Sequence, residues 1–164
     1  MRCLGMRMGG LLGLLLCVMG CGAGGAGPDP AVTKRLGLPE LPARVGLIDS
    51  NVSTEYATSE SGLKYRILRQ GTGAKPTASQ QVKVQYHGWL DNQKVFDSSY
   101  GRGAISFGLD QVIPGWTEGM QLVGQGGMIE LQIPGNLGYG ENGSPPDIPP
   151  NATLHFIVEL LEVR

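Results

Sequence analysis

Polar and apolar residues alternate in three segments of the chain, and this period of two predicts β-strands. The segments are 63–67, 82–86 and 129–133, and each has the pattern of a strand with one buried face. Residues 153–163 form a longer run rich in β-branched and aromatic side chains, which predicts a central strand. A further short strand is predicted to end at Phe96, after a turn.

One segment has the period of a helix instead. Trp116, Met120 and Val123 recur at positions i, i+4 and i+7, which places them on one apolar face. Pro114 suits the first helical position, and Gly124 suits a C-terminal stop. One short helix among several antiparallel strands predicts an α+β fold.

The first 27 residues follow neither pattern and hold nine of the 27 glycines. Arg2 and Arg7 give the start of the chain two positive charges. The apolar run 11–19 that follows is shorter than the about 20 residues that a membrane-spanning helix needs. A charged start, a short apolar core and small residues after it are the pattern of a secretory signal. We therefore predict a signal peptide at residues 1–20.

Cys21 follows Val18-Met19-Gly20, and this string resembles the bacterial lipobox. The resemblance implies cleavage before Cys21, lipid attachment to its thiol, and anchoring in the bacterial cell envelope at the periplasmic face. An ordinary signal of a soluble periplasmic or secreted protein is the alternative. All three cysteines lie in this head of the chain, so the mature chain has no disulfide framework and no cysteine metal site.

Residues 21–58 are expected to be the lipidated cysteine followed by a Gly/Pro-rich tether and linker. Several aliphatic residues lie in 31–50, but Pro39 and Pro42 interrupt any helical period. This segment is either a spacer or a strap laid on the domain surface. No aromatic residue precedes Tyr56, so the folded domain is assigned to residues 59–164.

Charge and histidine content exclude several classes of function. Without the predicted signal peptide the chain has 11 basic and 14 acidic residues and no basic stripe, so no nucleic-acid partner is expected. His87 and His155 are the only histidines and lie on predicted strands, so we expect no metal site and no cofactor. A hydrolase triad of Ser98, His87 and Asp97 is disfavoured because no nucleophile elbow is present.

Five short motifs occur in order along the second half of the chain. They are Val84-Gln85-Tyr86-His87-Gly88-Trp89-Leu90, Phe96-Asp97-Ser98-Ser99, Val112-Ile113-Pro114-Gly115-Trp116, Leu137-Gly138-Tyr139-Gly140 and Ile148-Pro149-Pro150-Asn151-Ala152-Thr153-Leu154. Each is weak alone, but together they resemble the FKBP-type peptidyl-prolyl cis/trans isomerases over about residues 60–164. The fold of that family is an antiparallel sheet curled around one short helix, which agrees with the prediction above.

The resemblance implies an enzyme that accelerates rotation about X–Pro bonds in exported proteins without a covalent step. Its partners would be proline-containing polypeptides, macrolides such as rapamycin are candidate ligands, and a monomer is expected. A weakly catalytic chaperone or partner-binding module of the cell envelope is the alternative reading.

The resemblance also assigns roles to individual residues. Trp116 would form the floor of the pocket, Tyr139 would donate its hydroxyl to a substrate carbonyl, and the N–H of Ile113 would make a second contact. Asp97 would be the one polar group in the wall and act electrostatically. The remaining wall and rim residues would be Tyr86, Phe96, Val112, Phe156, Ile148 and Ile105.

Three positions depart from the pattern of the family. Ile105 stands where an aromatic residue is frequent, Ser144 where a histidine is frequent, and Asp147 where an aliphatic residue is frequent. These residues belong to loops at the rim of the expected pocket. They bear on substrate preference and macrolide affinity.

Overall fold

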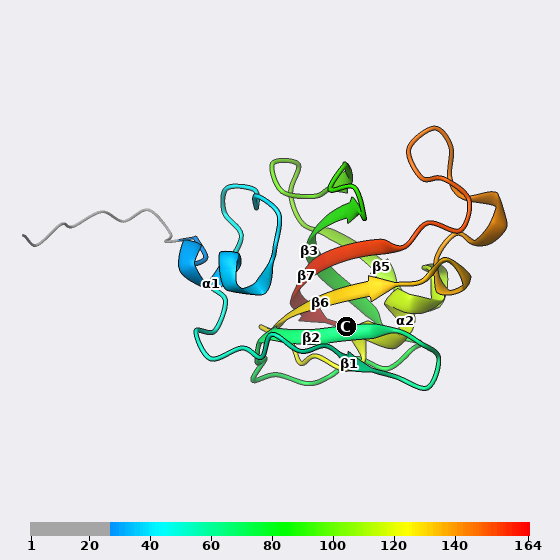
Figure 1. The fold of residues 1–164 in the computed structure, drawn as a ribbon. Helices are drawn as coiled ribbons and strands as arrows, with labels where there is room; N and C mark the ends of the chain where they lie inside the picture. The colour runs from blue at the N-terminus through cyan, green and yellow to red at the C-terminus, as the bar shows by residue number, and fades with distance from the viewer. Residues whose placement is uncertain (1–26) are drawn as a thin grey trace, which may run out of the picture.

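The alternating segments form strands of one antiparallel sheet, as the pattern predicts (Figure 1). The computed structural model describes residues 27–164, so the predicted signal peptide and the predicted lipid site at Cys21 lie outside the described residues. The strands are β1 (Ala57–Thr58), β2 (Lys64–Arg69), β3 (Gln81–Leu90), β4 (Val95–Ser98), β5 (Ile105–Gly108), β6 (Met128–Ile133) and β7 (Leu154–Val163). Their order is β1-β2-β6-β7-β3-β4, and β5 also pairs with β3.

The run at 153–163 is confirmed as a central strand. Strand β7 pairs with β6 along one edge and with almost the whole of β3 along the other. Both faces of β7 are covered over most of its length, which explains why its sequence is a continuous apolar run rather than an alternation.

Helix α2 (Pro114–Met120) lies against one face of the sheet and starts at the predicted proline. Trp116 and Met120 are buried on that face, whereas Val123 is buried beyond the end of the helix. The prediction that Gly124 stops the helix is therefore wrong. The N–H groups of Gln121 and Leu122 bond to carbonyls three residues back, which tightens the last turn and ends the helix early.

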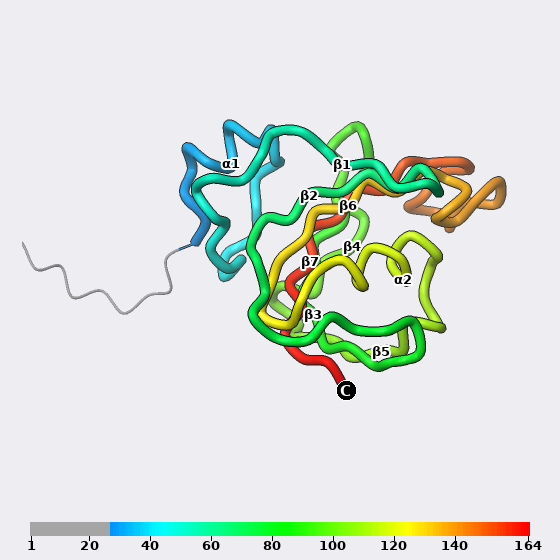
Figure 2. Tube along the Cα trace, turned by 90° about the horizontal axis from the view of Figure 1, so that it is seen from below, coloured from blue at the N-terminus to red at the C-terminus, as the bar shows by residue number. Residues whose placement is uncertain are grey.

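A second helix, α1 (Pro30–Leu36), lies on the opposite side of the sheet from α2 (Figures 1 and 2). The sequence pattern did not predict it, because it has only seven residues and ends before the prolines that interrupt any longer period. Asp29 accepts a hydrogen bond from the N–H of Ala31 (2.8 Å), and Gly37 ends the helix in the left-handed conformation (φ 68°). The α+β class is confirmed, and residues 27–164 contain two α-helices rather than the one predicted.

Residues 28–56, here called the N-terminal strap, pack on the face of the sheet that α2 leaves open. Of the two alternatives for 31–50, the structure therefore shows the strap. Its buried aliphatic residues contact four residues of the sheet in a second hydrophobic core. The members are Val32, Leu36, Val45, Ile48 and Val52 of the strap and Leu68, Trp89, Met128 and Ile157 of the sheet.

A buried ion pair fixes one end of the strap. Arg66 and Glu130 lie on neighbouring strands, are 5% and 2% exposed, and pair through Nε and Oε2. Arg66 also donates to the carbonyl oxygens of Leu36 (2.6 Å) and Thr54 (3.1 Å), and the Tyr56 hydroxyl donates to Glu130 (2.6 Å). The two charges are thus hydrogen-bonded to each other and to the strap, as buried charges require.

No helix within residues 27–164 has the length and apolarity that crossing a bilayer would need. The same residues contain no group of three or more histidine, cysteine, aspartate or glutamate side chains that could hold a metal ion.

His87 makes the stability of the fold depend on pH. It is 4% exposed on the strap side of β3, and neither ring nitrogen has a hydrogen-bond partner within the described residues. Burial lowers the pKa of His87 from its ordinary 6.5. The unfolded chain therefore binds more protons than the folded chain once the pH falls below about 6.5.

We expect the free energy of unfolding to be unaffected by His87 above pH 6.5 and to decrease as the pH falls toward the lowered pKa. Urea titrations at a series of pH values would measure the slope, and His87→Leu should flatten it. His155→Gln is the matched control, because His155 is bonded to Asp91 (2.7 Å) rather than unpartnered. An equal slope in wild type and His87→Leu would contradict the assignment to His87.

Candidate active site

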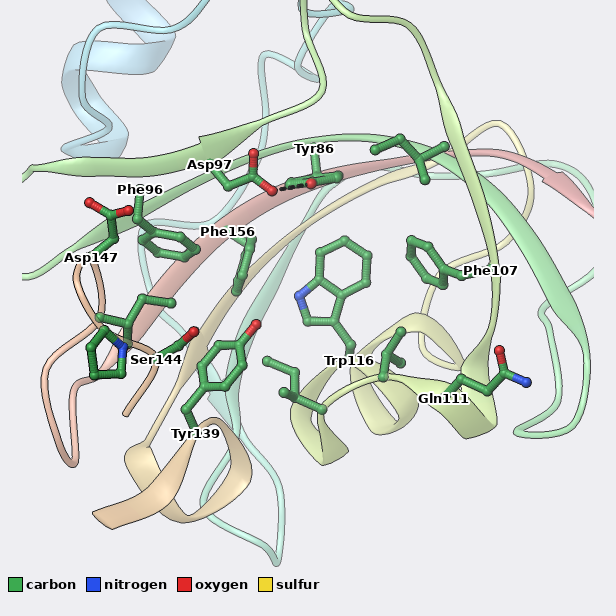
Figure 3. Close-up of a pocket in the computed structure, with 15 residues that line it drawn as sticks. Tyr86, Phe96, Asp97, Phe107, Gln111, Trp116, Tyr139, Ser144, Asp147 and Phe156 are labelled. Atoms are coloured by element: carbon green, nitrogen blue, oxygen red, sulfur yellow. Dashed lines mark hydrogen bonds between the residues drawn. The ribbon is translucent and has the colours of Figure 1, made fainter. Parts of the chain in front are cut away.

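The face of the sheet that carries α2 also holds a pocket of about 650 Å³. Its walls come from β3, β4, β5 and β7, and its lower side comes from α2 and the loop that follows β6 (Figure 3). The lining residues are Tyr86, Phe96, Asp97, Ile105, Phe107, Gln111, Val112, Ile113, Trp116, Tyr139, Ser144, Pro145, Asp147, Ile148 and Phe156.

Trp116 lies at the centre of an aromatic cluster in this pocket. Its ring is edge-on to Tyr86 (centroids 5.4 Å apart) and to Phe156 (5.1 Å), and it is tilted against Phe107 (5.3 Å). Phe156 is in turn edge-on to Phe96 at 5.4 Å. Such edge-to-face contacts fix ring orientations as well as bury area. The pocket therefore has a rigid aromatic floor.

Gly88 allows two of these rings to lie close to strand β3. A Cβ atom at this position would be 2.7 Å from Cε1 of Phe156 and 2.8 Å from Cζ of Phe96. Because such distances are below van der Waals contact, any larger residue would push the rings into the pocket. The packing of these two rings therefore explains why the first motif has a glycine at position 88.

Asp97 is the acidic group of the inner wall, and three donors surround it. The Tyr86 hydroxyl donates to Oδ2, while Arg102 and the N–H of Ser98 (2.8 Å) donate to Oδ1. Burial, and then the hydrogen bond to Asp97, raise the pKa of Tyr86 to about 12. The phenol is therefore a constant donor near neutral pH, and Asp97 is a fixed, partnered carboxylate.

The opposite side of the mouth is formed by Tyr139 and by the loop 144–148. Tyr139 follows the 3₁₀ helix η2 (Gly135–Leu137), is 44% exposed, and points its hydroxyl toward Trp116 and Phe156 (Figure 3). The backbones of Ser144 and Ile148 bond to each other at 2.8 and 2.9 Å, which closes the loop on itself.

An exposed ion pair includes Asp147, which lines the pocket. Nζ of Lys94, the residue before β4, lies 3.1 Å from Oδ1 of Asp147 in the loop 144–148, and both side chains are more than half exposed. Exposed pairs of this kind are worth little energy. The pair does, however, place opposite charges at the rim beside Phe96, where the family resemblance implied an aliphatic residue.

All ten residues predicted for the pocket line this one cavity. Sequence reasoning missed Phe107 and Gln111. The alternation in β5 could have revealed Phe107, because Ile105 and Phe107 are two residues apart and so share a face of the strand. Ile105 and Phe107 both line the pocket.

Comparison with known proteins gives consistent matches over this domain. A family model described as FKBP-type peptidyl-prolyl cis-trans isomerase matches residues 72–161. A protein of Haemophilus influenzae named probable FKBP-type peptidyl-prolyl cis-trans isomerase is 54% identical over 111 residues, covering 67% of this chain and 46% of its own. FkpA of Escherichia coli, named an isomerase of the same type, is 52% identical over 108 residues, covering 65% of this chain and 40% of its own.

Solved structures agree with these sequence matches. The crystal structure of FkpA from Escherichia coli aligns with a TM-score of 0.65 at 50% identity, covering 66% of this chain and 51% of that one. The crystal structure of AtFKBP13 aligns with a TM-score of 0.62 at 35% identity, covering 67% of this chain and 99% of that one. The chain thus matches less than half the length of the two relatives compared by sequence.

Proposed function

Since the chain belongs to the FKBP-type peptidyl-prolyl cis-trans isomerase family, we propose that it accelerates rotation about X–Pro peptide bonds of exported polypeptides. The observation that carries the proposal is the aromatic pocket around Trp116, with Asp97 on one wall and Tyr139 on the other. A proline ring is compact and apolar, and a concave apolar site with few polar groups suits it.

The reaction needs no nucleophile and no proton transfer. Rotation about the bond faces a barrier of about 18–20 kcal/mol, and uncatalysed exchange takes tens to hundreds of seconds. A thousandfold acceleration requires about 4 kcal/mol of preferential transition-state stabilisation. The twisted amide has lost resonance and is less polar than the planar amide, so an aromatic site that excludes water favours it.

Each polar group of the site has a positioning role in this mechanism. The Tyr139 hydroxyl and the N–H of Ile113 would hold two carbonyl oxygens of the peptide, while the proline ring rests on Trp116. Asp97 would act by its charge on the rotating carbonyl, because its oxygens already accept hydrogen bonds from Tyr86 and Arg102. A proton relay through Asp97 is not required.

A weakly catalytic chaperone is the second candidate, and the rim of the pocket favours it. The exposed apolar residues Ile105 and Tyr139 line the pocket, and Asp147, which also lines it, pairs with Lys94. Such a rim could hold an unfolded chain without turning over the bond. Macrolides such as rapamycin would compete with substrate only if they enter the pocket past this rim.

Refolding of a protein whose slow step is X–Pro isomerisation separates the two candidates. An isomerase raises the rate at catalytic amounts and leaves the yield unchanged in dilute solution. A holdase needs stoichiometric amounts and acts on the yield alone. Rate enhancement at one molecule per hundred substrates, abolished by rapamycin, would support the isomerase; an effect on yield alone would overturn it.

We also infer export to the cell envelope and lipid attachment at Cys21, from the signal pattern and the lipobox-like string before it. One acyl chain gives only marginal membrane binding, so stable attachment needs several chains on the same residue. Cys21→Ser is expected to move the protein from the membrane to the soluble fraction of cells. Cys17→Ser is the control and should remain in the membrane fraction; membrane association of Cys21→Ser would contradict lipidation there.

A further inference from the structure

Residues 97–103, here called the Asp97 segment, connect the pocket with the opposite side of the sheet. Asp97 and Arg102 pair at the pocket wall. Ser99 is fully buried between them, and its N–H bonds to the carbonyl of Tyr86 (2.9 Å). Tyr100, the next residue, packs instead against the second hydrophobic core, beside the N-terminal strap.

The Tyr100 hydroxyl belongs to a buried hydrogen-bonded cluster on the strap side of the sheet. It donates to Glu159 of β7, which is 8% exposed at its side chain. Glu159 also accepts hydrogen bonds from the N–H of Gly46 in the strap (2.9 Å) and from Arg69 (2.9 Å). A continuous series of contacts therefore runs from Gly46 through Glu159 and Tyr100 to the segment that carries Asp97.

The end of the Asp97 segment contains two glycines, so an anchor just before them restricts the part of the segment with the most backbone freedom. Gly101 and Gly103, on either side of Arg102, have φ angles of 92° and 104°, in the region open mainly to glycine. Glycine loses more conformational entropy on ordering than any other residue. A buried hydrogen bond from Tyr100 to a carboxylate opposes that loss one residue before the first glycine.

We propose that Tyr100 is a positioning residue, through which the docked N-terminal strap fixes Asp97 at the pocket. The inference rests on the proposed function only in that Asp97 faces the rotating amide. The strap is then a working part of the catalytic domain, although it lies on the far side of the sheet from the pocket.

Tyr56 provides a matched control for a purely structural role. Like Tyr100, it donates its hydroxyl to a buried glutamate that is paired with an arginine on the strap side of the sheet. Unlike Tyr100, it lies at the C-terminal end of the strap, before β1, and its hydroxyl bonds to Glu130 rather than to the cluster around Glu159. Tyr56→Phe and Tyr100→Phe each remove one hydroxyl and keep the ring.

The test combines amide hydrogen exchange with isomerase kinetics on the full chain. Tyr100→Phe should speed exchange at the N–H groups of Ser99, Arg102 and Gly103, which bond within the segment and to β3. It should lower kcat/KM by about three- to tenfold, the range of couplings carried by packed networks. Tyr56→Phe should change both readouts by less than about twofold while lowering the denaturation midpoint to a similar extent.

Two further variants make the test specific. Gly46→Ala puts a methyl group against the carboxylate of Glu159 and the guanidinium of Arg69, and should reproduce the effects of Tyr100→Phe from the strap. When Asp97→Asn is already present, adding Tyr100→Phe should lower kcat/KM by less than about twofold, because the effect of Tyr100 on activity passes through the carboxylate of Asp97.

The outcomes separate this inference from the proposed function. Unchanged exchange in the Asp97 segment of Tyr100→Phe, or equal effects of Tyr56→Phe on that segment, would overturn the inference. A wild-type chain that fails to catalyse would overturn the proposed function instead, and the exchange readout would still decide whether Tyr100 anchors the segment.

Discussion

Glu130→Leu is expected to lower the free energy of unfolding by about 3–5 kcal/mol, because it leaves the charge of Arg66 buried without its partner. Arg66 is 5% exposed, and its other donors are already used by two carbonyl oxygens of the N-terminal strap. The loss should therefore fall mainly on the docking of the strap. Chemical denaturation followed by tryptophan fluorescence would measure it, since Trp89 lies in the core beneath the strap.

The double variant Arg66→Met/Glu130→Leu tests the reason for this loss. Replacing both charges by apolar side chains removes the unpaired ion, so the double variant should be more stable than Glu130→Leu alone. Glu162→Gln is the surface control: Glu162 pairs with Arg164 in the open, and its loss should leave the midpoint unchanged. If Glu130→Leu behaves like Glu162→Gln, the buried pair does not hold the strap.

Trp116→Ala is expected to remove most of the isomerase activity, with a decrease in kcat/KM of about 100-fold, or about 2.7 kcal/mol of transition-state stabilisation. The indole is the floor of the pocket and contacts three other rings, so its loss opens the site to water and frees those rings. The free energy of unfolding should also fall, by about 3–5 kcal/mol.

Met120→Ala separates the effect on activity from the effect on stability. Met120 lies one turn further along α2, is fully buried, and does not line the pocket. Its truncation should cost about 2–5 kcal/mol of stability and leave kcat/KM within about twofold of wild type, measured where both variants are folded. Equal losses of activity in the two variants would mean that Trp116 matters for folding alone.

The strands that alternate along β2, β3 and β6 were predictable, because one face of each is buried and the period of two is local. The strap was not. Its docking depends on Gly46 meeting Glu159 and on Arg66 reaching the carbonyl of Leu36, contacts between segments far apart in the sequence. Backbone donors and acceptors leave no trace in the identity of the residue that carries them.

The pocket residues were predictable for a different reason. Their positions came from resemblance to a family, since periodicity alone cannot say that Tyr86, Trp116 and Tyr139 converge on one cavity. Phe107 was missed because β5 has only four residues, so the alternation of Ile105 and Phe107 is a weak signal beside those of the longer strands. Tyr100 was missed because nothing local distinguishes an aromatic residue facing the back of the sheet from one in a loop.

The measurement that most directly tests the account is cis–trans exchange of a short X–Pro peptide, followed by NMR exchange spectroscopy with substoichiometric protein. We expect the wild-type chain to raise the exchange rate far above the buffer rate, with no change in the cis/trans ratio. Rapamycin and Trp116→Ala should each suppress the enhancement, and Met120→Ala should preserve it. A wild-type exchange rate equal to that in buffer would contradict catalysis by the aromatic pocket.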